Sequence, residues 1–340
     1  MELQERKEIL ARWGEAIKGL DDTQRDEISW RAAGQNAWFT PQSIQKALEG
    51  VVHYLEAEQL DQWLAAYKFP NPQPKKIGLV LAGNIPMVGF HDLLCVLVSG
   101  HTALVKLSTQ DKVLLPYLVN ELLRPISENM ADQVVFAERL EGMDAVIATG
   151  SDNSSRYFDY YFGKYPHIIR RNRSSVAVID GKESEEDFTH LGRDIFDYFG
   201  LGCRNISKLM VPEGYDFQFM LDTLLRYEGV IHHHKYSNNY DYHKSIYLVN
   251  KEPHLDTGFL LLRESKDFVS PISVLFYEQY SDEQSLKETI DNHKEKIQVI
   301  TSREAWFDGS LPFGESQQPH VWDYADGVDT LAFLIEQHKA

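Results

Sequence analysis

The first 68 residues carry apolar side chains at three- and four-residue intervals. One apolar stripe spans residues 9–20 and another spans residues 44–67, and this spacing is typical of amphipathic helices. Thr40 and Pro41 predict a helix start, with Thr40 as the cap and Pro41 in the first helical position. The pattern therefore predicts a helical N-terminal region of residues 1–70 whose stripes are packing surfaces.

From residue 77 the pattern changes to short, mainly apolar runs separated by helical periodicity, and the run at 77–82 is apolar throughout. Such runs are typical of parallel strands that are covered on both faces. The runs lie at 77–82, 102–107, 133–136, 145–148 and 175–179, and the helical patterns between them lie at 88–98, 112–123 and 153–162. Alternation of this kind predicts βαβ units and a Rossmann-type α/β domain over residues 71–180.

Polar residues follow three of these predicted strands. They occupy position 84, positions 106–109 and positions 150–151, and ligands of such sheets bind outside the carboxyl ends of the strands. The Gly-Ser pair at 150–151 also precedes a predicted helix, where free N–H groups favour an anion such as a pyrophosphate. The three segments together predict a cofactor edge.

A single cysteine follows a pair of glycines in the second half of the chain. A helical pattern over 191–199 runs into Gly200 and Gly202, then Cys203 and Arg204, and an apolar run at 206–211 follows. A neighbouring cation and backbone N–H groups favour the thiolate, which can attack a carbonyl or a thioester. A buried structural cysteine is the alternative, and this stretch alone leaves both readings open.

The remaining pattern predicts a second α/β domain over residues 181–340, joined to the first by the charged, loop-like segment 182–187. A turn-rich segment around Phe313 is predicted to expose its aromatic ring. Short strands are expected at 245–249, 259–262, 273–277 and 297–301, and a short helix or strand at 328–333.

Composition narrows the function classes. The formal net charge is −17 and the pI about 5.2, which argues against nucleic acid or an anionic membrane as partner. The basic segment 168–173 is either a solvated edge or a phosphate-facing surface.

Two cysteines form no disulfide framework, so a cytoplasmic protein is expected. The N-terminus resembles no signal peptide, no apolar run is long enough to span a membrane, and adjacent histidines at 232–234 cannot all face one ion, so no metal is predicted.

The motifs, taken in order, resemble the aldehyde dehydrogenase superfamily, and within it the LuxC-type acyl-CoA reductases. The likeness spans residues 77–333 and includes the pairing of the Cys203 stretch with the ending at 322–330. The shared motifs are Asn-x-Pro at 84–86, Lys-x-Ser at 106–108, Gly-Ser at 150–151, Gly-x-x-Cys at 200–203, Ser-Pro at 270–271 and Pro-Phe-Gly at 312–314.

The resemblance implies a role for each matching residue. Cys203 matches the nucleophile, and Asn84 matches the amide that holds the oxyanion together with the cysteine N–H. The other matches concern ligands: Lys106, with Ser108 and Thr109 beside it, for the adenosine ribose; Gly150 and Ser151 for the pyrophosphate; Asp267 for the nicotinamide ribose; and Phe313 for the substrate.

Three departures from the family pattern carry chemical meaning, and one is Asp267, which stands where the family carries a glutamate and could hold the nicotinamide ribose less closely. Ile169 stands where ordinary aldehyde dehydrogenases carry the glutamate that activates the hydrolytic water, so hydrolysis of a cysteine thioester is expected to be slow. Thr109 stands where NAD enzymes carry a ribose-binding glutamate, and the loss of that acid removes repulsion toward a 2′-phosphate. The resemblance thus implies NADPH, with NADH as the alternative.

The implied activity is the reduction of an acyl-CoA, in this family a fatty acyl-CoA, to the aldehyde through an acyl-cysteine. One alternative is an aldehyde or semialdehyde dehydrogenase acting on a free aldehyde or acyl phosphate, with His91, His101 or Glu315 as the base. Another is an inactive cofactor-binding subunit. The family also implies an acyl-transferase or acyl-protein ligase as partner, and a homodimer is expected.

Overall fold

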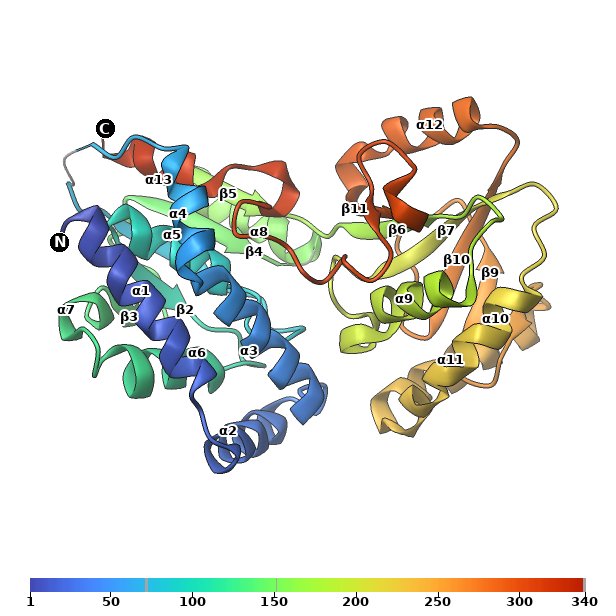
Figure 1. Cartoon of the computed structure of the whole chain (residues 1–340), viewed down its shortest axis with the longest axis horizontal. Coiled ribbons are helices and arrows are strands. Elements are labelled where there is room, and N and C mark those ends of the chain that lie inside the picture. Colours follow the sequence, from blue (N-terminus) through green and yellow to red (C-terminus); the bar gives the residue numbers. More distant parts are fainter. Residues whose placement is uncertain (71–72, 151, 339–340) are drawn as a thin grey trace. The chain divides into compact units, whose positions relative to one another are not determined.

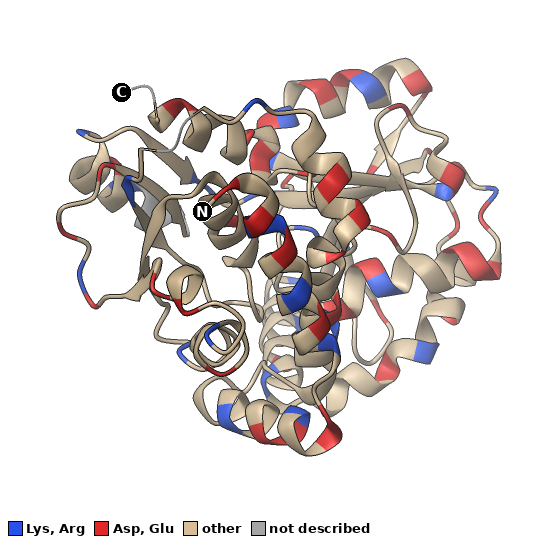
Figure 2. Ribbon diagram, turned by 60° about the vertical axis from the view of Figure 1, so that its left-hand side comes forward, with Lys and Arg blue, Asp and Glu red and all other residues tan. Residues whose placement is uncertain are grey.

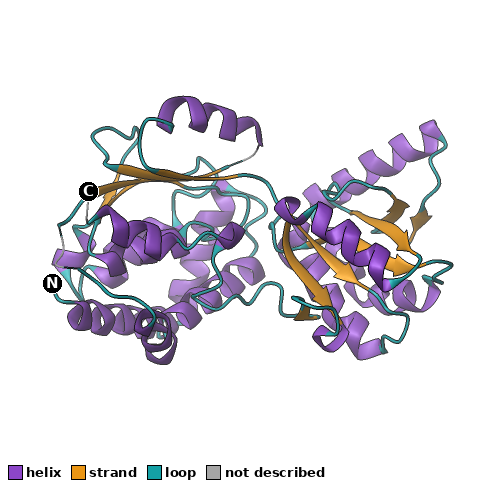
Figure 3. Cartoon of the chain, turned by 90° about the horizontal axis from the view of Figure 1, so that it is seen from above, coloured by secondary structure: helices purple, strands orange, loops and turns teal. Residues whose placement is uncertain are grey.

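The computed structural model describes residues 1–70, 73–150 and 152–338, and its secondary structure is mixed α/β, as predicted. The chain divides into two compact units. Unit 1 contains residues 1–172 and 319–340, and unit 2 contains residues 173–318. In each unit, helices flank a sheet of strands (Figure 3).

Unit 1 begins with the predicted helical region. Asp21 and Thr40 cap the second and third helices by accepting hydrogen bonds from the backbone N–H groups of Gln24 and Ser43. The apolar stripes face inward, with Leu10 and Trp13 fully buried. The helices are α1 (Leu3–Lys18), α2 (Asp22–Gln35), α3 (Pro41–Leu55) and α4 (Ala57–Ala65).

The described residues of unit 1 form a five-stranded parallel sheet of order β3-β2-β1-β4-β5. Successive strands are therefore added outward from β1 to β3 and then, on the other side of β1, from β4 to β5, so the order of the strands reverses between β1 and β4. The strands are β1 (Lys76–Val80), β2 (Thr102–Lys106), β3 (Val134–Phe136), β4 (Ala145–Thr149) and β5 (His167–Arg170). The last of these lies in the basic segment and was not predicted as a strand.

Helices cover the unit 1 sheet because its strands are apolar on both faces. Val146 and Ala148, alternate residues of β4, pack with Phe158 and Phe162 of α8. Helix α5 packs against β1 and β2. The remaining helices are α5 (Phe90–Ser99), α6 (Leu114–Tyr117), which continues as a π-helix (Leu118–Leu123), α7 (Glu128–Ala131), α8 (Asp152–Phe162) and α13 (Thr330–Gln337).

The C-terminal segment packs on unit 1, which corrects the prediction that it belongs with the second domain. Helix α13 contacts α5. The imidazole of His101 accepts a hydrogen bond from the N–H of Lys75 at 3.0 Å and donates one to the carbonyl of Leu334 at 2.9 Å. Arg170 is buried, pairs with Asp92 and donates to Thr330 at 2.8 Å. Arg170 is thus neither solvated nor phosphate-facing.

Unit 2 holds a seven-stranded sheet, within the described residues, of order β12-β11-β6-β7-β10-β9-β8, parallel except for the β8–β9 pair. Its first strand, β6, was predicted as part of the first domain, so the boundary lies at 172/173 instead of 180. The strands are β6 (Ser174–Val178), β7 (Ile206–Pro212), β8 (Leu255–Asp256), β9 (Leu261–Glu264), β10 (Val274–Tyr280), β11 (Ile297–Ser302) and β12 (Leu311–Pro312).

Two cores cover the unit 2 sheet. Ala177 and Ile179 face α9 and α10, and Val176 and Val178 face α12, in agreement with the positions of these helices in Figure 1. Residues 184–187 open α9 with a capping box and do not join two domains. The helices are α9 (Glu185–Phe196), α10 (Gln218–Leu224), α11 (His234–Asn250) and α12 (Glu283–Asn292), with 3-10 turns at Asp197–Gly200 and Leu225–His232. The strand predicted at 245–249 is wrong, because these residues form the end of α11.

Acidic and basic residues alternate along the exposed helices (Figure 2). Among the described residues, no helix combines the length and hydropathy needed to cross a membrane.

The buried ion pair yields a stability prediction. Asp92→Ala removes the carboxylate and leaves the Arg170 guanidinium buried without its counter-charge, which destabilises a protein by roughly 3–5 kcal/mol. Denaturant unfolding of purified variants measures the loss. Arg171→Ala is the control, since Arg171 is exposed and its removal should change the free energy of unfolding by less than about 0.5 kcal/mol. Equal effects of the two variants would contradict the prediction.

His101 makes stability depend on pH. Burial lowers the pKa of His101 to about 4, below the ordinary value of 6.5, so the unfolded chain binds the extra proton first. The stabilisation is complete above pH 6.5 and is lost as the pH falls toward 4. We expect the melting temperature of His101→Gln to fall less steeply than that of the wild-type protein between pH 7 and pH 4.5. Parallel melting curves for the two proteins would count against this assignment.

Candidate functional site

The carboxyl ends of β1, β2 and β4 gather the predicted cofactor residues of unit 1. Asn84 follows β1, Lys106 ends β2 and Gly150 follows β4. Strands β1 and β4 are neighbours on either side of the point where the strand order reverses, and sheets of this kind bind ligands there. Asn84, Lys106 and Thr109 are exposed, and Ser108 is half-buried. Ser151 lies outside the described residues.

The loop that carries Asn84 is held by residues that the sequence did not single out. The amide of Asn36 donates to the carbonyl of Gly83 at 3.2 Å. A side chain on Gly83 would meet the hydroxyl of Ser108 at 2.6 Å, so only glycine lets the two segments approach. Asp111 accepts hydrogen bonds from the N–H groups of Met87 and Leu114, and burial raises its pKa. No periodicity points to Asn36, because its partner is 47 residues away.

This donor set fits a dinucleotide. An ammonium group and two hydroxyls occur within the four residues 106–109 at the end of β2, and they offer a cation and hydrogen-bonding groups for a ribose and its phosphate. The backbone of the 83–84 segment lies against Ser108. Helix α8 starts directly after β4, which is the arrangement that favours a phosphate at a helix N-terminus.

Cys203 belongs to unit 2 and its thiol is exposed, so it is not a buried structural cysteine. Helix α9 ends at Phe196, earlier than predicted, and Tyr198 and Phe199 adopt left-handed φ values of 52° and 58° before Gly200 at 75°. The turn places Cys203 just before β7. Cys95 is instead fully buried in α5, and burial raises the pKa of its thiol well above the usual range.

Buried polar groups fix the backbone around Cys203. Ser175 donates to the Cys203 carbonyl at 2.9 Å, and the amide of Asn205 donates to the carbonyls of Asp194 and Asp197 at 3.0 and 2.7 Å. Arg204 donates to the carbonyl of Ser316 at 3.4 Å. The one sequence signal for Asp194 is that it interrupts the apolar face of α9, where it is 1% exposed.

The remaining predicted residues of unit 2 differ in exposure. Asp267 is exposed and precedes Phe268, whose carbonyl accepts from Ser207 at 2.6 Å. Phe313 is only 5% exposed and packs in the core under α9, so the prediction of an exposed aromatic ring is wrong. A pocket lies behind the Cys203 turn, and its walls include Phe199, Tyr236 and Ile272.

The histidines considered as general bases are engaged elsewhere. His101 is fully buried between Lys75 and Leu334. The Nε2–H group of His91 donates a hydrogen bond to the carbonyl of Val321 at 2.7 Å. Glu315 is exposed. In the described parts of the chain, no cluster of three His, Cys, Asp or Glu side chains has the arrangement of a metal site.

The fold is shared with solved aldehyde dehydrogenases. The NAD-dependent enzyme from Sinorhizobium meliloti superposes with a TM-score of 0.66 at 12% identity, covering 92% of this chain and 72% of its own. The Mycobacterium tuberculosis enzyme, solved with NAD+, gives 0.64 at 12% identity, with 89% and 73% covered. Methylmalonate-semialdehyde dehydrogenase from Oceanimonas doudoroffii gives 0.66 at 13%, with 89% and 73% covered. This confirms the predicted aldehyde dehydrogenase-like fold.

The sequence itself identifies the family. No curated protein matches the chain at a significant level. The family description that matches is that of the acyl-CoA reductases (LuxC), over residues 6–214, which includes both the Asn84 loop and the Cys203 turn and confirms the predicted resemblance. The chain is therefore an oxidoreductase of acyl and aldehyde groups and belongs to the acyl-CoA reductase (LuxC) family.

Proposed function

We propose that the protein reduces a fatty acyl-CoA to the aldehyde with NADPH, through a thioester on Cys203. The observation that carries the proposal is the exposed Cys203 thiol on a turn held by buried polar contacts, in a chain of the acyl-CoA reductase family. The match to the acyl-CoA reductase (LuxC) family supports an acyl-CoA as the substrate.

Cys203 carries the covalent chemistry in this proposal. Its thiolate attacks the thioester carbonyl, the new S–C bond forms, and the carbonyl π electrons move onto oxygen. Asn84 and the N–H of Cys203 are the proposed donors to that oxyanion, each worth roughly 3 kcal/mol in the transition state. The oxyanion then collapses and expels coenzyme A as a thiolate, which needs little help from an acid because thiols ionise near neutral pH. Cys203 Sγ leaves in turn when the aldehyde is released.

Lys106, Ser108, Thr109 and Gly150 are proposed from their place at one sheet edge of unit 1, and Ser151 and Asp267 from the family resemblance alone. Lys106, Ser108 and Thr109 would hold the adenosine ribose and its 2′-phosphate, and Gly150 and Ser151 the pyrophosphate. Asp267 would hold the nicotinamide ribose. When bound, the reduced nicotinamide supplies the hydride that brings the acyl group to the aldehyde level.

The surroundings of β5 favour transfer to a thiol over hydrolysis. Ile169, the proposed counterpart of the water-activating glutamate, is an aliphatic residue on β5, and its neighbour Arg170 is committed to Asp92 and Thr330. His101 is buried in a backbone-bonded position. An aldehyde dehydrogenase that releases a free acid would need another base, so we favour acyl-CoA reduction over that alternative and over an inactive subunit.

The state of the cysteines and the family likeness bear on the cellular compartment and the partners of the protein. Both cysteines are reduced thiols, which supports a reducing compartment such as the cytoplasm. The family likeness supports an acyl-transferase or acyl-protein ligase as the source of acyl groups, and we propose a homodimer. Phe313 has no direct role in substrate binding in this proposal, because it is buried.

Removal of the thiol tests the covalent step. Cys203→Ala should abolish acyl-CoA-dependent NADPH oxidation, by roughly 10³-fold or more, since a nucleophile cannot be replaced by positioning alone. Radiolabelled acyl-CoA should label the wild-type protein and leave Cys203→Ala unlabelled. Cys95→Ala is the matched control and should keep both properties, because Cys95 is buried in α5. Full turnover by Cys203→Ala would end the proposal.

Thr109 tests the choice of cofactor. Thr109→Glu places a carboxylate beside the proposed 2′-phosphate, and a repulsion of about 1.4 kcal/mol changes an affinity tenfold. We expect kcat/KM for NADPH, divided by that for NADH, to fall at least about tenfold. Thr109→Gln has the same size without the charge and should leave the ratio near that of the wild type. A ratio that does not respond to the charge would refute the assignment.

A further inference from the structure

Three consecutive residues before the Cys203 turn have left-handed backbone conformations. The φ values are 52° for Tyr198, 58° for Phe199 and 75° for Gly200. Glycine accepts this region freely, but each non-glycine residue pays roughly 1–2 kcal/mol there. Strain of this kind persists only where surrounding contacts over-determine the backbone, and it gathers at functional sites.

Asn205 holds both ends of this left-handed stretch. Its Nδ2 donates to the carbonyl of Asp194 at 3.0 Å and to that of Asp197 at 2.7 Å, ahead of the stretch. Its Oδ1 accepts from the N–H of Gly202 at 2.8 Å, after the stretch. Asn205 is 2% exposed, so both donors and the acceptor of one buried amide are used across the strained segment.

Asp194 ties the same turn to a second loop. Its carboxylate accepts from the N–H of Gly314 at 2.8 Å, from the N–H of Ser316 at 3.1 Å and from the hydroxyl of Ser316 at 2.6 Å. The Ser316 carbonyl in turn accepts from Arg204, the residue after Cys203. The Asp194 carboxylate therefore holds the 314–316 loop in place, and this loop in turn contacts Arg204, the residue next to Cys203.

We propose that Asn205 is a positioning residue that keeps the strained turn in the one conformation that presents the Cys203 thiol, with Asp194 as its second anchor. The inference rests on the proposed role of Cys203 as nucleophile. Without the amide, the turn gains by relaxing residues 198 and 199 to right-handed or extended backbone, and the thiol moves with it.

The geometry requires an amide and not a carboxylate at position 205. An aspartate keeps the acceptor for Gly202 but has no donor for the carbonyls of Asp194 and Asp197, and it buries a charge against them. Asn205→Asp should therefore release the turn although it differs from the native side chain by one group. Asn205→Ala removes all three contacts, and Asp194→Asn removes one of the two acceptors that Gly314 and Ser316 use.

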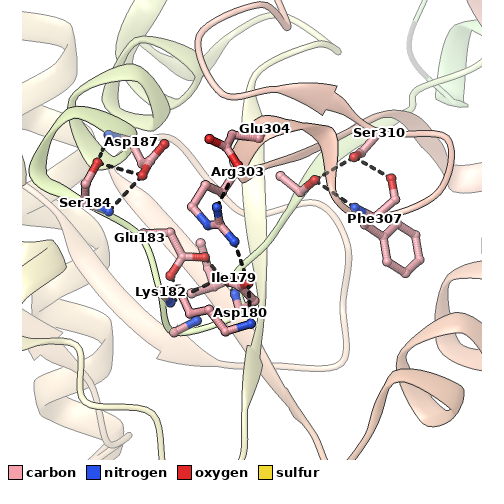
Figure 4. Close-up of polar contacts among 12 residues, drawn as sticks. Ile179, Asp180, Lys182, Glu183, Ser184, Asp187, Arg303, Glu304, Phe307 and Ser310 are labelled. Carbon is pink, nitrogen blue, oxygen red and sulfur yellow. Dashed lines mark hydrogen bonds and ion pairs between the residues drawn. The ribbon is translucent and has the colours of Figure 1, made fainter.

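Glu183 provides a matched control within unit 2. It is 8% exposed and accepts from the N–H groups of Asp180 and Gly181 at 2.7 and 3.0 Å. Figure 4 shows it beside Asp180 and Arg303 at the carboxyl end of β6. Burial raises the pKa of Glu183 to about 7 and that of Asp194 to about 6. Cys203 precedes β7, whose start lies next to the start of β6, whereas Glu183 follows the carboxyl end of β6, so Glu183 lies at the end of the strands opposite to Cys203.

The experiment measures the reactivity of the thiol without any substrate. The second-order rate of Cys203 alkylation by iodoacetamide is followed at pH 8 by mass spectrometry of the peptide that contains Cys203, together with melting curves and with kcat and KM for acyl-CoA. We expect Asn205→Ala and Asn205→Asp to slow alkylation and lower kcat by tenfold or more, with KM changed less than threefold. Asp194→Asn should lie between these variants and the wild type.

The control separates positioning from general destabilisation. Glu183→Gln should lower the melting temperature about as much as Asp194→Asn and leave alkylation at the wild-type rate. Wild-type alkylation in a folded Asn205 variant, or an equal loss in Glu183→Gln, would overturn the inference, and Asp194→Asn supplies the test if neither Asn205 variant folds. If the wild type shows no acyl-CoA turnover while the alkylation differences hold, the proposed function fails and the positioning role stands.

Discussion

Both units depend on one constraint: a parallel sheet must be covered on both faces. Parallel strands need crossover connections, and these connections place helices above and below the sheet. In unit 2 the alternation of Val176, Ala177, Val178 and Ile179 divides β6 between two separate cores. The constraint leaves only the strand ends and loops free to carry chemistry, which is where the proposed cofactor residues and Cys203 lie.

Much of this architecture could be predicted because buried strands and helices carry characteristic patterns of apolar residues along the sequence. The runs at 77–82 and 145–148 are apolar throughout, and their short length and flanking glycines favour buried strands over helices, which are usually ten or more residues long. The exceptions have physical causes. Helix α11 was missed at 245–249 because its exposed side includes Leu248 and Val249, at 59% and 81% exposure, so its pattern resembles a strand. Strand β5 was missed because Arg170, a buried cation, interrupts its apolar run.

The site divides in the same way. Cys203, Asn84 and Lys106 could be found because each follows or precedes a recognisable strand. Asn205, Asp194 and Asn36 could not, because their function consists of hydrogen bonds to backbone groups, and any segment of the chain offers such groups. Phe313 shows the converse: a residue in a recognisable motif, expected at the surface, is held in the core of unit 2 because its ring packs with Leu191 and Ile195.

The discontinuity of unit 1 has a consequence for biosynthesis. Residues 319–340 complete the covering of α5 and engage His101 and Arg170, yet the ribosome delivers them only after the whole of unit 2. At about 5–20 residues per second, residues 173–318 take roughly 7–30 seconds to synthesise. During that interval unit 2, which is continuous in sequence, can fold. The apolar helix α5 of unit 1 is not yet covered by helix α13. Nascent unit 1 is thus the part of the chain that a ribosome-bound chaperone would be expected to shield.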